Sequence, residues 1–197
     1  MPPRLLIATT NSGKAREIAA ILAEVPVEPV YLGELPPMPG APEDRDTFEG
    51  NAIQKARHYG SLSGLATIAE DAGLEIPALE GWPGVYSSRV APTDRERVAL
   101  ALERLAGRTG EDRDARFVSV AAFFDPEKDF IKTFFGVCQG QLIEEPRGDN
   151  GFGYDPIFWH PGYGRTLAQL STEEKNLVSH RGQSFRALAR YLKDYKW

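Results

Sequence analysis

The sequence has almost no cysteine, no long apolar run and no excess of positive charge, and each shortage excludes a class of protein. Cys138 is the only cysteine among 197 residues, so a disulfide framework and a thiolate metal cluster are excluded and a reducing cytoplasm fits. No segment approaches the roughly 18 apolar residues of a transmembrane helix, and the amino-terminal apolar stretch is too short for a signal peptide. The formal net charge of −5 argues against a surface that coats nucleic acid. We therefore expect a cytoplasmic protein whose partners include neither membrane nor nucleic acid.

What remains is the composition of an ordinary globular protein, with 42% hydrophobic and 26% charged residues. The length suits one domain, or one core with a lobed insertion. Apolar periodicity predicts strands over 4–8, 66–71, 115–125 and 129–140, a further extended segment over 73–79, and helices over 15–22, 47–62, 93–105 and 183–196. Strands that alternate with helices at both ends, around a hairpin-rich middle, predict an α/β protein with an elongated mixed sheet and flanking helices.

Residues 7–18, "IATTNSGKAREI", join an apolar strand to a helix through hydroxyls, an amide, a glycine and Lys14. Backbone N–H groups are free at a helix N-terminus, and the macrodipole favours an anion there, so the junction suits a phosphate group. A Ser or Thr N-cap with a solvated Lys14 accounts for the same residues, because caps of this type are common. The stretch alone leaves both interpretations open.

Two further stretches place polar residues at the ends of predicted elements. In "TFEGNAIQKA", Asn51 and Lys55 are four residues apart and share one helix face, which is also the pattern of a solvated helix surface. In "EDAGLE", Glu70 and Asp71 end an apolar strand, and Gly73 is expected to let the chain turn at once. Adjacent strand residues point to opposite faces, so only one of the two acids is expected to face a given site. A pair of solvated acids in a turn remains the alternative.

Two stretches near the carboxyl end combine aromatic, acidic and basic residues. "NGFGYDPIF" frames an acid with aromatic rings and flexible backbone, which suits a flat base as well as a surface turn. It is not a dinucleotide fingerprint, because the spacing of its glycines does not fit G-x-G-x-x-G. "STEEKNLVSHRGQS" adds Lys175, His180 and Arg181 near the start of the last helix, where a lone histidine is more often structural.

Taken together, these stretches hold several cations, an acid pair, a helix N-terminus and aromatic glycine-rich backbone. That inventory is typical of a nucleoside triphosphate site with a divalent metal, because Mg²⁺ is held by one or two carboxylates together with substrate phosphates. The Walker A sequence G-x-x-x-x-G-K-[ST] does not occur, so the chain is not a P-loop enzyme.

The motifs "TTNSGK", "TFEGNAIQKA", "EDAGLE…GWPGVYSSR", "GFGYDPIF" and "EEKNLVSHRGQSFRAL" occur in this order over nearly the whole chain. In this respect the sequence resembles the inosine triphosphate pyrophosphatase family, whose RdgB-like members act on non-standard purine nucleoside triphosphates. The resemblance implies a single domain over residues 1–197, with two lobes around a central substrate cleft, and a homodimer. It also implies Mg²⁺-dependent hydrolysis of ITP, dITP and XTP to the monophosphate and pyrophosphate.

The resemblance assigns roles to residues that match the family motifs. Asp71 is implied as the proton acceptor, and Glu43 and Asp71 as metal ligands. The residues implied to bind the substrate are Thr9, Thr10, Asn11, Ser12, Gly13, Lys14, Lys55, Ala72, Phe152, Gly153, Tyr154, Asp155, Lys175, His180 and Arg181. Of these, residues 9–14 and Lys55 would meet the triphosphate, and the last seven would form the base pocket and its phosphate-facing edge.

Two departures from the family pattern stand out. Ala72 replaces a serine that family members often carry, so no hydroxyl is available there, although the Ala72 backbone still is. Gly50 stands where a glutamate is frequent. Within this reading, Asp71 deprotonates a water, and Glu70 would raise the Asp71 pKa by repulsion while a metal would lower it. Donors for the 6-oxo group of the base are expected from Arg181, His180 and backbone N–H groups of residues 152–155.

Two other classes of function remain to be weighed. A regulatory module that binds nucleotides without hydrolysing them would keep the cations but would not need a positioned acid such as Asp71. A structural or interaction protein would need neither, and it leaves the polar clustering at the element junctions unexplained.

Overall fold

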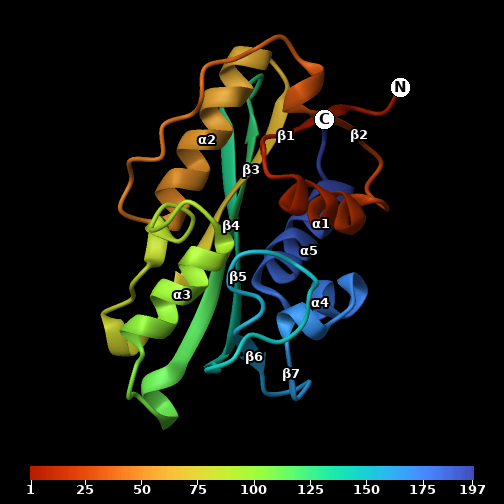
Figure 1. Ribbon diagram of the computed structural model, residues 1–197. Coiled ribbons are helices and arrows are strands. Elements are labelled where there is room, and N and C mark those ends of the chain that lie inside the picture. The colour runs from red at the N-terminus through yellow and green to blue at the C-terminus, as the bar shows by residue number, and fades with distance from the viewer. The chain divides into compact units, whose positions relative to one another are not determined.

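The computed structural model describes residues 1–197, which form one seven-stranded mixed sheet and five α-helices (Figure 1). The strand order is β2-β1-β3-β4-β5-β6-β7. The strands are β1 (Arg4–Ile7), β2 (Glu28–Tyr31), β3 (Ala66–Glu75), β4 (Asp114–Asp125), β5 (Phe130–Leu142), β6 (Phe158–His160) and β7 (Arg165–Thr166). The helices are α1 (Ser12–Leu22), α2 (Phe48–Ser63), α3 (Asp94–Arg104), α4 (Thr172–Val178) and α5 (His180–Lys193). β1 pairs in parallel with β2 and β3, whereas β5, β6 and β7 pair antiparallel. The predicted α/β class with a mixed sheet is confirmed.

The chain divides into two compact units, and β3, β4 and β5 each contribute residues to both. Unit 1 comprises residues 1–71, 119–136 and 181–197. Its core lies between the sheet and helices α1 and α5, with Ile18 and Leu22 from α1 against Phe185, Leu188 and Leu192 from α5. The predicted apolar face of the last helix is therefore confirmed as core.

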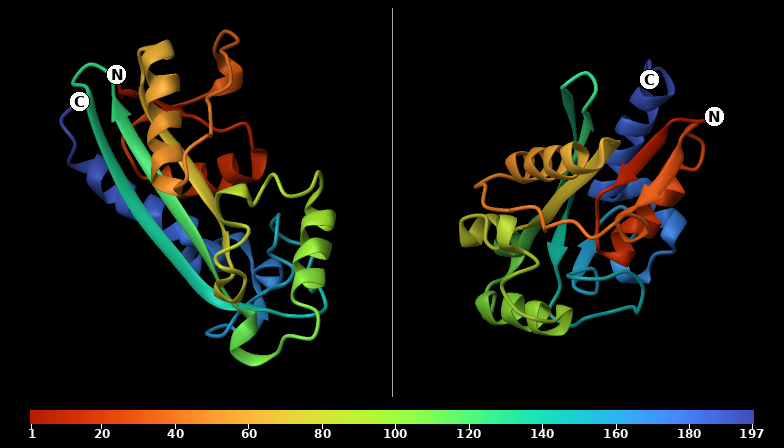
Figure 2. Two further views of the ribbon diagram at one scale, coloured as in Figure 1. Left: turned by 90° about the vertical axis from the view of Figure 1, so that its left-hand side faces the viewer. Right: turned by 90° about the horizontal axis from the view of Figure 1, so that it is seen from above.

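Helix α2 covers the opposite face of the sheet in unit 1 (Figure 2). Its buried side includes Ala52 and Ala56, both fully buried. A Cβ at Gly60 would lie 2.6 Å from the Phe124 ring of β4, so the absence of a side chain lets the helix approach the sheet. Thr47 caps the helix by accepting from the Gly50 N–H, as its position in the sequence predicts.

Unit 2 comprises residues 72–118 and 137–180. Helix α3 begins with a capping box, in which Thr93 Oγ1 accepts from the Glu96 N–H and the Glu96 carboxylate accepts from the Thr93 N–H. Its apolar side packs into a core with Phe117, Cys138 and Phe158 from the sheet. Cys138 is buried in this core, and burial raises the pKa of its thiol to about 12.

Three sequence expectations are corrected by the structure. β3 does not end at Asp71 but runs to Glu75, and Gly73 lies inside the strand rather than in a turn, because β4 continues to pair alongside. Residues Thr172–Val178 form a separate helix, α4, that the sequence did not indicate. The last helix begins at His180 rather than Gln183.

No helix is both long enough and apolar enough to span a membrane. The elongated shape, the two lobes and the central cleft stay predictions.

Candidate active site

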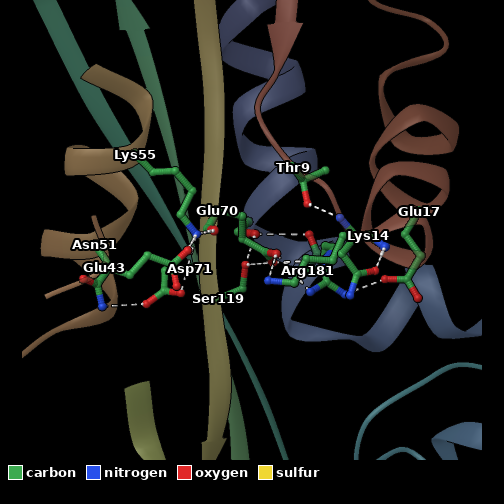
Figure 3. A network of polar contacts seen from close by, with 12 residues as sticks. Thr9, Lys14, Glu17, Glu43, Asn51, Lys55, Glu70, Asp71, Ser119 and Arg181 are labelled. Atoms are coloured by element: carbon green, nitrogen blue, oxygen red, sulfur yellow. Dashed lines mark hydrogen bonds and ion pairs between the residues drawn. The ribbon is translucent and has the colours of Figure 1, made fainter. Parts of the chain in front are cut away.

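Strand β3 separates two clusters of charged side chains in unit 1 (Figure 3). β1 pairs with β3 only as far as Ile7 opposite Ile68, and the Ala8 N–H still donates to the Ile68 carbonyl. Glu70 and Asp71 follow directly, so they lie just beyond the carboxyl end of the parallel strands, where α/β sheets place ligands. The two acids point to opposite sides of the strand, as predicted (Figure 3).

On one side of β3, Asp71 meets residues of α2. Asp71 Oδ2 accepts from Asn51 Nδ2 at 3.0 Å, and Asp71 Oδ1 lies 3.9 Å from the Lys55 ammonium. Lys55 Nζ also pairs with Glu43 Oε1 and donates to the Glu70 carbonyl at 3.1 Å. Asp71 is only 8% exposed, and burial raises the pKa of its carboxyl despite the lowering effect of Lys55, Lys14 and the Asn51 hydrogen bond. A carboxylate with a raised pKa is a stronger proton acceptor than an ordinary aspartate.

The loop that carries Glu43 is tied along one face of α2. Asn51 accepts from the Arg45 N–H and donates to the Arg45 carbonyl, and Gln54 Nε2 donates to Asp44. Further along the helix, His58 contacts the Pro39 carbonyl and the Tyr59 hydroxyl accepts from the Ala41 N–H. These contacts hold the loop beside Lys55, which is why Glu43 reaches the same ammonium as Asp71. Gly50 fits here as well, because a Cβ would lie 2.9 Å from Arg45 Cβ.

On the other side of β3, Glu70 is surrounded by donors. Arg181 donates to it through Nη2 at 3.0 Å and pairs with it through Nε at 2.9 Å. Lys14 Nζ lies 3.1 Å from Glu70 Oε2, and the Ser119 hydroxyl donates to Oε1 at 2.8 Å. Arg181 also donates from Nη1 to Glu17 of α1 at 2.6 Å. Glu70 is therefore a compensated buried carboxylate that links α1, β4 and α5 to β3.

Arg181 is 1% exposed, and it stays charged. Burial alone would lower the pKa of its guanidinium, but Glu70 and Glu17 outweigh burial and raise it. The raised pKa of Asp71 comes mainly from burial, with a smaller contribution from the Glu43 carboxylate. Glu70 points to the other side of β3 and is paired with Arg181 and Lys14, so its expected repulsion of Asp71 is weakened.

The junction between β1 and α1 is capped by Asn11, not by a serine or threonine. Asn11 Oδ1 accepts from the Lys14 N–H at 3.0 Å, and the Asn11 N–H donates to Thr9 Oγ1 at 3.2 Å. Thr10 directly precedes the cap, and Ser12 and Gly13 are the first two residues of α1. Lys14 is not simply solvated, because its side chain is 19% exposed and pairs with Glu70. The structure therefore brings Lys14 to the acid pair that the sequence singled out separately.

In unit 2, the buried Asp155 carboxylate contacts two other predicted base-pocket residues, Lys175 and Phe152. Asp155 Oδ2 accepts from Lys175 Nζ at 2.6 Å and from the Phe152 N–H at 2.9 Å. Lys175 Nζ in turn lies 4.8 Å from the centroid of the Phe152 ring. Gly151 has φ +79°, and a Cβ there would come within 2.1 Å of Asp155 Oδ2, so only glycine allows this carboxylate its position. This buried pair places a carboxylate and an ammonium beside an aromatic ring.

The other predicted base-pocket residues have separate partners. The Gly153 N–H donates to Asp94 at the start of α3, and the buried Tyr154 hydroxyl donates to the Ser87 carbonyl. The His180 ring stacks on Phe117 at 4.7 Å between centroids. The N–H groups of Phe152, Gly153 and Asp155 already donate within the protein, so they do not offer the expected donors for a 6-oxo group. Ala72, also assigned to substrate, is half-buried in β3.

Sequence analysis missed several residues of these clusters. Asn51 was noted only as a partner of Lys55 on a helix face, yet it is fully buried against Asp71. Ser119 is a polar residue at a core-facing position between Phe117 and Ala121, which is a usable signal. Glu17, on a helix of largely apolar pattern, carried no signal that distinguishes it from a surface acid.

The carboxylates around Lys55 are the candidate ligands of a divalent cation. No group of three or more histidine, cysteine or acidic residues converges as a complete metal cage. Glu43 and Asp71 nevertheless both approach one positive charge, the Lys55 ammonium, which acts as a stand-in cation. Two carboxylates with further oxygen ligands from substrate phosphates and water suit Mg²⁺. The residues present therefore fit the metal.

Comparisons with known proteins agree with the motifs. A sequence model described as the Ham1 family matches residues 5–191. A dITP/XTP pyrophosphatase of Symbiobacterium thermophilum is 47% identical over 190 residues, which cover 96% of this chain and 93% of that protein. A dITP/XTP pyrophosphatase of Desulfotalea psychrophila is 44% identical over 187 residues, 93% of this chain and 82% of that protein. The solved structure of a HAM1 protein from Coxiella burnetii matches with a TM-score of 0.87 and 40% identity, covering 98% of this chain and 100% of that one.

Proposed function

The chain belongs to the Ham1 family, and from this premise we propose that it hydrolyses non-standard purine nucleoside triphosphates, dITP, ITP and XTP, to the monophosphate and pyrophosphate. It is a hydrolase of the bond between the α and β phosphates. Its role in the cell is to remove these nucleotides from the nucleotide pool.

One observation supports this function more than any other, namely the environment of Asp71. The acid lies beyond the end of the parallel strands, has a raised pKa because it is buried, and is oriented by Asn51 Nδ2 at 3.0 Å. Two lysines that would bind phosphate act on Asp71. Lys55 lies 3.9 Å from its carboxylate, and the positive charge of Lys14 also lowers its pKa. A binding module would need the lysines only.

In the proposed mechanism, Asp71 accepts a proton from the water that attacks the α phosphorus. General-base assistance of this kind contributes roughly 10²–10⁴-fold to the rate. Lys14 and Lys55, with the N-terminus of α1 capped by Asn11, hold the triphosphate and stabilise the charge that develops on the leaving pyrophosphate. Glu70 keeps Lys14 in place through the 3.1 Å contact.

Glu43 and Asp71 would hold Mg²⁺, which supplies Lewis-acid neutralisation of the phosphate oxygens when bound. The chain's own task is to keep these two carboxylates close together. The tie between Asn51 and Arg45 and the burial of Asp71 do this.

Selectivity for 6-oxo purines would come from Asp155 and Lys175. Hypoxanthine and xanthine carry a donor at N1 and an acceptor at the 6-oxo group, whereas adenine carries the reverse. A carboxylate beside an ammonium matches the first arrangement, and Phe152 offers a face for the ring to stack on. A site built on such hydrogen bonds can reject the wrong analogue by about 10⁴–10⁵-fold. GTP, which shares the 6-oxo group, would be refused at its 2-amino group. The predicted contacts of His180 and Arg181 with the base stay predictions.

The decisive experiment measures products as well as rate. Purified protein is incubated with dITP, ITP, XTP, ATP or GTP, with and without Mg²⁺, and phosphorus NMR identifies the products. We expect the monophosphate and pyrophosphate from the first three with Mg²⁺ and little from ATP or GTP. Release of a diphosphate and inorganic phosphate, or tight binding without turnover, would contradict the proposal.

We further propose that the protein is a cytoplasmic homodimer, on the strength of the family membership. Light scattering of the purified chain tests the oligomeric state directly.

A further inference from the structure

Lys55 occupies a place that a metal ion could take. Its ammonium meets three oxygen atoms from three residues, Glu43 Oε1, Asp71 Oδ1 at 3.9 Å and the Glu70 carbonyl at 3.1 Å. The side chain is only 12% exposed, so it is held in this position rather than free in solvent. Two carboxylates and a carbonyl are the oxygen ligands that a hard divalent cation prefers.

The ammonium and a divalent ion exclude one another at this place. Mg²⁺ binds its oxygen ligands at about 2.0–2.1 Å, so an ion on Glu43 and Asp71 would lie within a few ångströms of Lys55 Nζ. Like charges at such a distance repel strongly in a partly buried site. For the ion to bind both carboxylates, Lys55 must therefore find another partner.

The charges around Lys55 point to a phosphate group as the new partner of its ammonium. Four carboxylates, Glu17, Glu43, Glu70 and Asp71, are paired with three cations, Lys14, Lys55 and Arg181. At Lys55 itself, two carboxylates share one ammonium, which disfavours a polyanionic ligand that arrives without a cation of its own. A triphosphate with its metal offers Lys55 new oxygen partners and gives Glu43 and Asp71 a new cation in the same event.

We propose that Lys55 serves as an internal cation that holds Glu43 and Asp71 in the free protein, so that a divalent ion binds there only together with the phosphates of the substrate. The inference rests on the proposed function and adds an order of binding to it. Lys55 is then a positioning residue for two carboxylates before it becomes a phosphate ligand. The free protein has low affinity for the ion, and metal and nucleotide bind with strong positive coupling.

The first test is a calorimetric titration of the substrate-free protein with Mg²⁺. We expect Lys55→Met to bind Mg²⁺ roughly tenfold or more tightly than the wild type, within the range usual for coupled ligands. Lys14→Met is the matched control, because it also removes one positive charge near Asp71, whereas Lys14 pairs with Glu70 and not with Glu43. It should strengthen Mg²⁺ binding much less. An equal gain in both variants, or no gain in Lys55→Met, would overturn the proposal.

The second test uses the wild-type protein and does not depend on a variant that folds. Mg²⁺ is titrated in the absence and presence of an α,β-methylene analogue of ITP that cannot be hydrolysed. We expect the analogue to tighten Mg²⁺ binding by roughly tenfold or more, and Mg²⁺ to tighten binding of the analogue by the same factor. Mg²⁺ binding that is already tight without the analogue, and unchanged by it, would overturn the proposal. Hydrolysis of dITP is measured on the same samples, so a failure of the proposed function is distinguished from a failure of the binding order.

Discussion

Glu70 and Asp71 are neighbours on one strand, carry the same charge and are both buried, yet the fold treats them in opposite ways. Glu70 accepts from Arg181, Lys14 and Ser119, so its negative charge is compensated. Asp71 accepts a hydrogen bond from Asn51 Nδ2 and lies 3.9 Å from the Lys55 ammonium, and burial raises its pKa. The comparison teaches that alternation along a strand turns neighbouring acids toward different partners, which compensate the charge of Glu70 and leave Asp71, the proposed proton acceptor, with a raised pKa.

The largest effect should follow from removal of the proton acceptor. Asp71→Asn keeps the shape of the side chain and an oxygen that can accept from Asn51, so the fold should persist while kcat falls by roughly 10²–10⁴-fold or more. KM should change less, because the base acts mainly in the transition state. Steady-state pyrophosphate release measures both values, with Glu70→Gln as the neighbouring comparison. A variant Asp71→Asn that turned over near the wild-type rate would show that another group is the base.

The next largest effect should be on stability, on the Glu70 side of the strand. Arg181→Met leaves Glu17 and Glu70 buried without their shared cation, and loss of such a partner costs about 3–5 kcal/mol. Arg57→Met is the control, since the Arg57–Asp129 pair is exposed and should contribute less than about 1 kcal/mol. Urea unfolding gives both free energies.

The same Arg181→Met protein also tests the base pocket. If Arg181 recognises the base, the ratio of kcat/KM for ITP to that for ATP should narrow. An unchanged ratio with a large loss of stability would leave Arg181 as an anchor of Glu70 alone.

A smaller effect should come from the hydroxyl that completes the shell of Glu70. Ser119→Ala removes one donor from a carboxylate that keeps Arg181 and Lys14, and a single hydrogen bond to a charged group contributes about 1.5–3 kcal/mol at most. We expect a loss near the lower end, since the other donors remain. Thermal unfolding measures it, and Ser61→Ala on the exposed face of α2 should leave Tm unchanged. A loss as large as that of Arg181→Met would mean that the hydroxyl, and not the guanidinium, compensates Glu70.

The smallest expected effect is a gain in stability, because it follows from removal of the buried charge of Asp71. Because the folded pKa of Asp71 lies above its unfolded value of 3.8, the folded protein binds the proton more tightly, and its stability falls as pH rises through that window. Above the folded pKa this cost is fully present, so metal-free Asp71→Asn should be more stable than the wild type at neutral pH. Below pH 3.8 the gain should vanish. Denaturant unfolding at several pH values tests this, and a loss of stability at neutral pH would show that Lys55 compensates the charge fully.

Much of the fold could be predicted because its signals are local. Thr47 and Thr93 cap the helices they precede, and apolar periodicity located α1, α2, α3 and the β4–β5 pair. The end of β3 could not be predicted, since Gly73 is a common turn residue and only the neighbouring strand β4 keeps it extended. Helix α4 was missed because its seven residues are too few for a clear period.

The same distinction between local sequence signals and tertiary contacts applies to the candidate site. The motifs that resemble the inosine triphosphate pyrophosphatase family pointed to Lys14, Lys55, Asp71 and Asp155, but they did not reveal the partners of these residues. Whether the charge of an acid is compensated depends on partners from distant parts of the chain, as with Glu17 and Arg181, which are 164 residues apart. Burial and charge compensation are properties of the packed protein, so the chemical state of these side chains arises only when the sheet and its helices come together.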